Sequence, residues 1–522
     1  MKKHTPIWRK FLTIAAAAFI LGLLPYLWHM AFMDSPDVGF AEYLSRSAAE
    51  SMKLLSEYVP LIAAAYVACI ALLIFLEGQN PDRTILWLMT LIFLPVAGII
   101  LYMLLGPDMK RIKMRRLFKP TKSYPSTKKF DWGRTPAVRR VSILAYHNSS
   151  SGICERCGVE ILIDGAATFS SIKRELRRAK RYINIEYFIF RDDALGREIA
   201  EILSERARDG LAVRMAVDGV GSWKLGRGLK STLTDSGVLV KTFMPVSFPA
   251  LHSAINYRNH RKIIVIDGEV AFTGGLNIGL DYVGKGPLGK WRDTHVLFRG
   301  DAVRALNAIF LSDWAICTGE NFSPYEPAFA PPPGASATLP FTPTQIVAGG
   351  SGSAWRSIHQ IFFTMITSAE KRIWITTPYL VPNEAILDAL RVSALSGVDV
   401  RILLPKKSDH FLSHWAGFSN IEDLLRAGVR IWLYTDGFVH AKTLVMDDAI
   451  ASVGTANLDN RSLEINFEVQ AFIYDSKICS EVAGHFMADI ETSEECLLGS
   501  WEKRGLGPKV LESLGKLWSS QI

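Results

Sequence analysis

Two segments of the chain carry the same polar residues at the same spacing. They are His260-Arg-Lys262 with Asp267 and Asn277, and His440-Ala-Lys442 with Asp447 and Asn457. The positions pair as 260 with 440, 262 with 442, 267 with 447 and 277 with 457, so each landmark recurs after 180 residues. A repeat on this scale predicts two similarly folded halves, which constrains the architecture more than any other feature of the chain.

The repeat extends well beyond these polar residues. Residues 209–219 (DGLAVRMAVDG) match residues 396–406 (SGVDVRILLPK), and residues 236–245 (SGVLVKTFMP) match residues 427–436 (AGVRIWLYTD). Short apolar strands alternate with charged, helix-like segments in both halves, which indicates an α/β fold. We expect a first lobe at 151–320, a Pro-rich linker at 321–343 and a second lobe at 344–522 that ends in an amphipathic helix.

The residues after each lysine are apolar and include β-branched types, which predicts a strand at 262–266 and another at 442–446. Residues two apart on a strand share a face, so each histidine should point the same way as its lysine. The aspartate follows at an odd step, and Asp267-Gly268 is typical of a hairpin turn. We therefore expect Asp267 and Asp447 to be mainly structural members of the two motifs.

Two copies of this pattern brought together would surround one anionic centre with paired imidazole, ammonium and amide groups. Imidazole acts as a nucleophile, acid or base near neutral pH, and an ammonium group suits a phosphate oxygen. The pattern predicts in-line transfer of a phosphoryl group through a phosphohistidine, with one histidine attacking and the other protonating the leaving oxygen. The candidate catalytic residues are His260, Lys262, Asp267, His440, Lys442 and Asp447, and the candidate phosphate-supporting residues are Asn277, Asn457, Thr455 and Gly275.

Each histidine also needs an acidic partner that fixes its tautomer. Asp293 lies 33 residues after His260, and Glu468 lies 28 residues after His440. Both acids fall in strand-like runs, so we nominate them as the histidine-orienting residues. No His/Cys cluster indicates a metal site, and the chemistry requires no cofactor. A single His-x-Lys would be read as a core histidine beside a solvated lysine, but a pair in register with a wider repeat argues against that interpretation.

The N-terminal residues 1–108 contain three uncharged apolar runs, at 11–31, 59–76 and 84–107, each near the length that crosses a bilayer. The second and third runs predict a transmembrane helical hairpin, and the first predicts an additional apolar helix. Residues 109–150 form a basic juxtamembrane linker, with twelve basic residues and one acid between Lys110 and Arg140. This charge places the large domain in the cytoplasm by the positive-inside rule and favours anionic lipid over nucleic acid as its partner. Whether the first run spans the membrane stays open, because three spans cannot place both basic flanks on one side.

Two other apolar segments each have two readings. The residues Phe411, Leu412, Trp415 and Phe418 have helix-like spacing just before the second motif. They either line an access route for acyl chains or form an ordinary core face, and residues 510–518 of the tail leave the same choice.

At the repeated motifs the chain resembles the phospholipase D superfamily, whose signature is HxKxxxxD with a trailing GxxN. Within that superfamily it is similar to the bacterial cardiolipin synthases. The stretches that carry this second resemblance are 80–106 in the apolar module, 259–279, WRDTHV at 291–296 and 440–469. The resemblance implies two phospholipase D-like lobes that form one pseudo-symmetric pair behind the membrane module.

The resemblance also implies an activity. Two phosphatidylglycerol molecules would give cardiolipin and glycerol through a phosphohistidine, with His260 as nucleophile and His440 as acid and base. The alternatives are a hydrolase of the same fold and a phosphatidyltransferase with another acceptor. We expect a multi-pass protein of the cell (inner) membrane, with phosphatidylglycerol and anionic lipid as partners. The oligomeric state stays open.

Overall fold

The computed structural model describes residues 68, 72, 81–94, 97–98, 135–245, 257–332, 334, 338–350, 353 and 355–518. The chain divides into two compact units, Met1–Gly106 and Pro107–Ile522. In the first unit the structure describes helix α3 (Pro81–Phe93), which covers the start of the third apolar run. Among the described residues no helix has both the length and the apolar character needed to cross a bilayer. Most of the predicted membrane hairpin and the additional N-terminal helix lie outside the described residues.

The second unit consists of a leading helix and two lobes. The leading helix is α6 (Pro136–Ser149). The first lobe contains β1 (Cys154–Ile163), α7 (Asp164–Arg178), β2 (Tyr182–Tyr187), α8 (Ala194–Arg208), β3 (Ala212–Asp218), α9 (Arg227–Asp235), β4 (Leu239–Phe243), β5 (Ile263–Ile266), β6 (Val270–Gly274), η1 (Leu280–Val283), β7 (Trp291–Arg292), β8 (Thr294–Gly300), α11 (Asp301–Thr318) and η2 (Pro327–Phe329).

The second lobe repeats this order with some additions at its end. It contains β9 (Phe341–Gly349), α12 (Ser357–Ser368), β10 (Arg372–Thr376), β11 (Leu380–Val381), α13 (Glu384–Leu395), β12 (Asp399–Pro405), α14 (Phe411–Phe418), α15 (Ile421–Arg426), β13 (Arg430–Tyr434), β14 (Phe438–Val439), β15 (Thr443–Met446), β16 (Ile450–Gly454), β17 (Leu458–Asp459), α16 (Asn460–Glu464), β18 (Glu468–Ile473), α17 (Ser476–Glu491), β19 (Ser493–Glu495), α18 (Leu498–Glu502) and α19 (Leu506–Trp518).

One continuous sheet runs through both lobes. Its strand order is β19-β13-β12-β10-β15-β16-β18-β9-β1-β8-β6-β5-β2-β3-β4, which reads alike outward from the central antiparallel pair β9–β1. In each lobe the strand after the histidine motif pairs antiparallel with both of its neighbours. These are β2 and β6 for β5, and β10 and β16 for β15. The α/β fold with two repeated lobes is therefore confirmed, and the repeat is a pseudo-two-fold relation about the β9–β1 seam.

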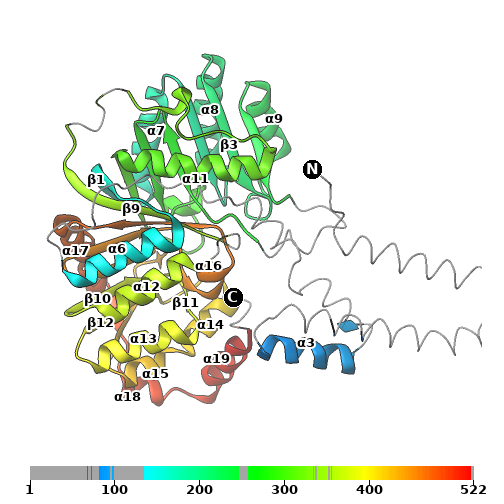
Figure 1. The fold of residues 1–522 in the computed structure, drawn as a ribbon. Helices are drawn as coiled ribbons and strands as arrows, with labels where there is room; N and C mark the ends of the chain where they lie inside the picture. Colours follow the sequence, from blue (N-terminus) through cyan, green and yellow to red (C-terminus); the bar gives the residue numbers. More distant parts are fainter. Residues whose placement is uncertain are drawn as a thin grey trace, which may run out of the picture. The chain divides into compact units, whose positions relative to one another are not determined.

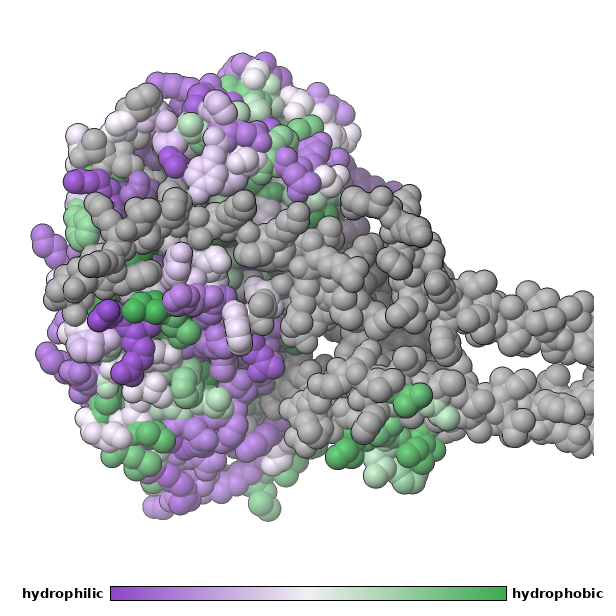
Figure 2. All heavy atoms as spheres, viewed as in Figure 1, coloured by the Kyte–Doolittle hydropathy of each residue, from purple (hydrophilic) through white to green (hydrophobic). Residues whose placement is uncertain are grey.

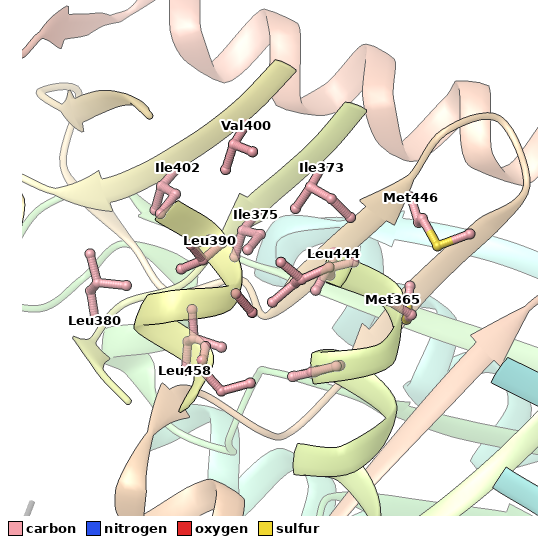
Figure 3. Close-up of a cluster of buried hydrophobic side chains, with 14 of the residues drawn as sticks. Met365, Ile373, Ile375, Leu380, Leu390, Val400, Ile402, Leu444, Met446 and Leu458 are labelled. Atoms are coloured by element: carbon pink, nitrogen blue, oxygen red, sulfur yellow. The ribbon is translucent and has the colours of Figure 1, made fainter. Parts of the chain in front are cut away.

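Helices cover the sheet and seal its apolar core. Figure 1 shows α7, α8 and α9 grouped on the first lobe and α12, α13 and α15 on the second. In the second lobe, side chains such as Ile373, Ile402 and Leu444 project from β10, β12 and β15 toward Met365 of α12 and Leu390 of α13 (Figure 3). On the visible face of the unit, polar residues are interspersed with separate apolar patches (Figure 2).

Helix α6 differs from the sequence expectation, which assigned its residues to the basic linker. Ala137, Val138, Val141 and Ala145 are buried in the apolar core of the second lobe. Their spacing places them on one face of a helix, and Thr135 caps its N-terminus by accepting from the backbone N–H of Val138. The basic composition of this stretch concealed a short amphipathic helix that belongs to the folded unit.

The aspartates of the repeated motifs fasten the ends of neighbouring strands. The Asp267 carboxylate accepts hydrogen bonds from the backbone N–H groups of Lys180, Arg181 and Tyr182, at 2.7 to 2.9 Å, where β2 begins. Asp447 does the same for residues 370–372 at the start of β10, at 2.8 to 3.2 Å. Both aspartates have a positive φ, of 56° and 53°, in the tight turn that follows the motif strand. A carboxylate that accepts three backbone N–H groups is a structural clamp.

We expect Asp447→Asn to lower the unfolding free energy by about 2 kcal/mol, because hydrogen bonds to an ionised acceptor are replaced by weaker neutral ones. Asparagine tolerates a positive φ, so the change isolates the charge. Thermal unfolding of the purified full chain measures the effect. The matched control is Asp448→Asn, whose carboxylate is 58% exposed and pairs with Arg372 at the surface. Equal shifts for the two variants would contradict the clamp.

Candidate active site

The two motif histidines lie where the lobes exchange short segments of backbone. The residue before His260 forms a parallel bridge with Phe467 of the second lobe, and the His260 N–H donates to the Phe467 carbonyl at 2.9 Å. In the same way β14 pairs in parallel with β7 of the first lobe, and the His440 N–H donates to the Arg292 carbonyl at 2.7 Å. Each histidine is therefore held by backbone of the other lobe.

The acidic partners are exchanged in the same way. His260 Nδ1 lies 3.0 Å from Oε2 of Glu468, and His440 Nδ1 lies 2.8 Å from Oδ2 of Asp293. A carboxylate at Nδ1 fixes the tautomer that carries the proton there, so Nε2 of each ring is left for chemistry. Sequence reasoning named both acids but placed each by its distance from the histidine of its own half. The pairing crosses the seam between the lobes instead.

The motif lysines are buried beside their histidines. Lys262 Nζ donates to the His260 carbonyl at 2.7 Å, and Lys442 Nζ donates to the His440 carbonyl and lies 2.9 Å from His440 Nδ1. Burial lowers the pKa of Lys262 to about 7 and that of Lys442 to about 8, although Glu468 and Asp293 oppose the shift. Two buried ammonium groups favour an anionic occupant, which would restore their full charge.

Burial and neighbouring positive charge lower the pKa of both imidazoles in the free protein. Burial lowers the pKa of His260, and Glu468 opposes this. The pKa of His440 lies well below its ordinary value because of burial first and Lys442 second. Lys442 also acts on His260, and Lys262 on His440, so each lysine contributes to the electrostatics of the other motif. The four side chains form one electrostatic site.

The two acids differ in how the chain makes room for them. A Cβ added at Gly275 would lie 2.0 Å from Oδ1 of Asp293, so the glycine is required by the position of that carboxylate. At the equivalent position Thr455 donates its hydroxyl to Oε2 of Glu468. Burial raises the pKa of Asp293, whereas His260 and Lys262 outweigh burial and lower that of Glu468. Gly275 therefore leaves space for the Asp293 carboxylate, and Thr455 holds the Glu468 carboxylate by a hydrogen bond.

The two asparagines of the motifs are already engaged with protein groups. Asn277 accepts from the Ile189 N–H at 3.1 Å and donates to the Tyr282 hydroxyl at 3.0 Å. Asn457 donates to Asp459 at 3.0 Å. One N–H of each amide is thus used to position the loop after β6 or β16. The motif aspartates, Asp267 and Asp447, contact the strand ends and do not join the cluster of histidines and lysines.

Arg261 is a site residue that sequence reasoning missed. It is fully buried and donates to the carbonyls of Glu468 and Gly349, at 3.0 and 2.9 Å, and to the Asp313 carboxylate. It thereby ties the backbone of the acid that faces His260 to both lobes. The only sequence signal is a third polar residue, between His260 and Lys262, where the second copy has Ala441.

Comparison with known proteins shows which family the chain resembles. The chain matches the model described as "Cardiolipin synthase, PLD-like domain" at residues 172–314 and 362–490, and that described as "Phospholipase_D-nuclease N-terminal" at 64–107. It is 41% identical to the cardiolipin synthase of Halalkalibacterium halodurans over 87% of this chain and 92% of that protein. It is 36% identical to the major cardiolipin synthase ClsA of Bacillus subtilis, over 86% of this chain and 95% of that one.

Among solved structures, the chain resembles the phosphatidylserine synthase of Haemophilus influenzae with a TM-score of 0.56 and 15% identity, over 73% of this chain and all of that one. This likeness concerns the fold. The sequence relatives share more than a third of their residues with this chain over most of its length, and the family model covers both lobes. The chain therefore belongs to the cardiolipin synthase family of the phospholipase D superfamily.

Proposed function

We propose that this protein transfers a phosphatidyl group from one phosphatidylglycerol molecule to another, which yields cardiolipin and glycerol. The observation that carries the proposal is the pair of crossed histidine–carboxylate contacts, at 3.0 and 2.8 Å, beside two buried lysines. Two oriented imidazoles beside two ammonium groups match the needs of phosphodiester exchange at one phosphorus atom. The identity of the lipid substrate is inferred from the relatives, which are named cardiolipin synthases.

In the first step Nε2 of His260 attacks the phosphorus of the donor lipid. A P–N bond forms, the P–O bond to the terminal glycerol breaks, and His440 gives its Nε2 proton to the departing oxygen. The anionic phosphate of the bound donor raises the pKa of His440, so His440 enters the reaction protonated while His260 is neutral, and the two rings titrate as a coupled pair. Glu468, whose pKa is lowered, is the anionic partner that offsets positive charge on His260 as the bond forms.

In the second step a hydroxyl of another phosphatidylglycerol molecule attacks the phosphohistidine. Its proton passes to His440, a new P–O bond forms and the P–N bond to His260 breaks. Both histidines return to their starting protonation states, and the products are cardiolipin and glycerol. Lys262 and Lys442 bind the non-bridging phosphoryl oxygens throughout, where charge is concentrated in the transition state.

We further infer that the apolar N-terminal runs hold the enzyme in the cell membrane, with the catalytic unit on the cytoplasmic side. The three uncharged apolar runs within residues 1–108 support this location, and the last two overlap the match to the model described as "Phospholipase_D-nuclease N-terminal" at 64–107. The basic stretch between Lys110 and Arg140 supports the orientation, because basic flanks are retained on the cytoplasmic face.

The purified full chain, given phosphatidylglycerol in detergent micelles, should release cardiolipin and glycerol in equal amounts, as resolved by mass spectrometry. His260→Ala and His440→Ala should each reduce turnover by about 100-fold or more, because each removes a group that makes or breaks a bond. His485→Ala, on α17, is the control and should retain activity. Phosphatidic acid as the sole product would instead establish a hydrolase with the same fold.

Gly275→Ala should lower kcat by about 100-fold or more, because the added methyl group displaces Asp293 from His440 and the ring loses its oriented tautomer. Asp293→Asn should show a similar loss. Gly484→Ala is the matched control, since its added Cβ would meet nothing within 4 Å. Circular dichroism and thermal unfolding verify that the variants fold. A folded Gly275→Ala enzyme with normal kcat would refute the role of the crossed pair.

The pH dependence should show the lowered lysine pKa values. Lys262 and Lys442, with pKa values of about 7 and 8, lose positive charge in the free enzyme as pH rises through this range. The anionic donor then binds more weakly, so kcat/KM should fall above about pH 8. The bound phosphate keeps both groups protonated, so kcat should fall only at higher pH. Steady-state kinetics from pH 6 to 10 measure both, and a level kcat/KM up to pH 9.5 would contradict the assignment.

A further inference from the structure

Helices α14 and α19 pack against each other and leave apolar side chains in solvent. A Cβ added at Gly515 would lie 2.5 Å from the Ala416 backbone nitrogen, which shows how closely the helices approach. The Arg504–Glu512 ion pair, at 2.6 Å, and the contact of Phe418 with Trp501, at 5.6 Å, also anchor this corner. The exposed apolar residues are Phe411, Leu412, Leu506, Val510, Leu514 and Leu517, which together we term the α14–α19 face.

The four α19 members of this face form a continuous stripe. Their spacing of four, four and three residues places them on one side of the helix. Between half and four-fifths of each residue is exposed, from 51% for Leu514 to 82% for Leu506. Four large aliphatic residues exposed in one row exceed the scattered single residues that any protein surface carries.

The α14–α19 face is linked to the catalytic site through β11. Asn420, just after α14, donates to the Leu380 carbonyl at 3.0 Å, and β11 pairs in parallel with β17, which directly follows Asn457 of the second motif. Asp409 lies two residues before Phe411, and its carboxylate accepts from the Tyr379 hydroxyl at 2.6 Å. After burial and Lys442, Asp409 is the next largest influence on the pKa of His440, and it opposes their lowering effect. The loop that opens α14 is therefore within electrostatic reach of a reacting histidine, while the following turn of the helix carries an exposed phenylalanine.

The charges around the face are complementary to anionic lipid. Lys503 and Lys516 are exposed near its two ends, and Lys509 lies between them with its ammonium group on the Glu502 carbonyl. The one acid within α19, Glu512, is neutralised by Arg504. An aliphatic stripe edged by lysines is the composition of a helix that lies in the interfacial layer of a bilayer, whereas the centre of a protein interface is depleted of lysine.

We propose that the α14–α19 face lies in the interfacial layer of an anionic phospholipid bilayer, next to the mouth of the active site. Acyl chains of the substrate stay in the bilayer beside this face, and the phosphoglycerol headgroup passes by Asp409 to the buried histidines. The proposal rests on the proposed function and deepens it, because it identifies the surface through which the lipid reaches the site.

The direct test places an environment-sensitive fluorophore on a cysteine at position 514 of the full chain, reconstituted in phosphatidylglycerol vesicles. Leu514→Cys should give blue-shifted emission that brominated phospholipids quench strongly. Leu395→Cys on α13, where leucine is 73% exposed, is the matched control and should be quenched little. Labelled wild type supplies the background from native cysteines. A blue shift without bromolipid quenching would assign the face to a second copy or another part of the chain, and no shift would leave it in water; either result overturns the proposal.

The functional test compares two forms of one substrate. Val510→Lys/Leu514→Lys should lower kcat/KM for phosphatidylglycerol in vesicles about tenfold, because lysine resists burial among acyl chains. Turnover of short-chain phosphatidylglycerol below its critical micelle concentration should stay within about twofold. Val392→Lys/Leu395→Lys on α13 should change neither. Equal losses on both substrates, or unchanged vesicle activity, would refute the proposal. Failure of the wild type to form cardiolipin would refute the proposed function, while the quenching test would still decide the docking surface.

Discussion

The contact between each motif histidine and a carboxylate of the opposite lobe is the interaction on which the site depends. His260 faces Glu468 and His440 faces Asp293, and the same exchange is repeated in backbone hydrogen bonds at both histidines. Neither lobe contains a complete imidazole–acid pair by itself. The continuous sheet across the β9–β1 seam fixes the separation of the lobes, so the geometry of both pairs follows from how that seam is built.

The repeated lobes, the motif strands and the turns that follow them could be predicted from the sequence, because they depend on patterns of nearby residues. The 180-residue offset predicted the repeated α/β lobes, the apolar run after each lysine predicted β5 and β15, and the odd step to the aspartate predicted a residue that belongs to a turn. Asp267 and Asp447 lie in tight turns, and each accepts hydrogen bonds from backbone N–H groups at the start of the neighbouring strand. Such features depend on period and turn chemistry, and both are written in a few consecutive residues.

What escaped sequence reasoning depends on docking between distant segments. Nothing in the residues near Asp293 states that its carboxylate will meet His440, since that contact forms only when β7 pairs with β14. The role of Gly275 is equally non-local, because its missing side chain matters only once Asp293 fills the space. Arg261 occupies a variable position of the motif, and its role depends on hydrogen bonds from its guanidinium to backbone carbonyls of the other lobe. Helix α6 was overlooked for another reason: its apolar face was masked by surrounding basic residues.

The crossed pairing has a consequence for how the two copies diverge. A substitution near Asp293 alters the imidazole of the second lobe, and one near Glu468 alters that of the first. Gly275 and Thr455 occupy equivalent positions in the repeat, yet one leaves space for a carboxylate and the other donates a hydroxyl to it. Selection on either histidine therefore acts on residues of the opposite duplicate. The two halves are therefore constrained to change together. Replacing one half alone with that of a distant relative would pair each histidine with an acid from a different protein.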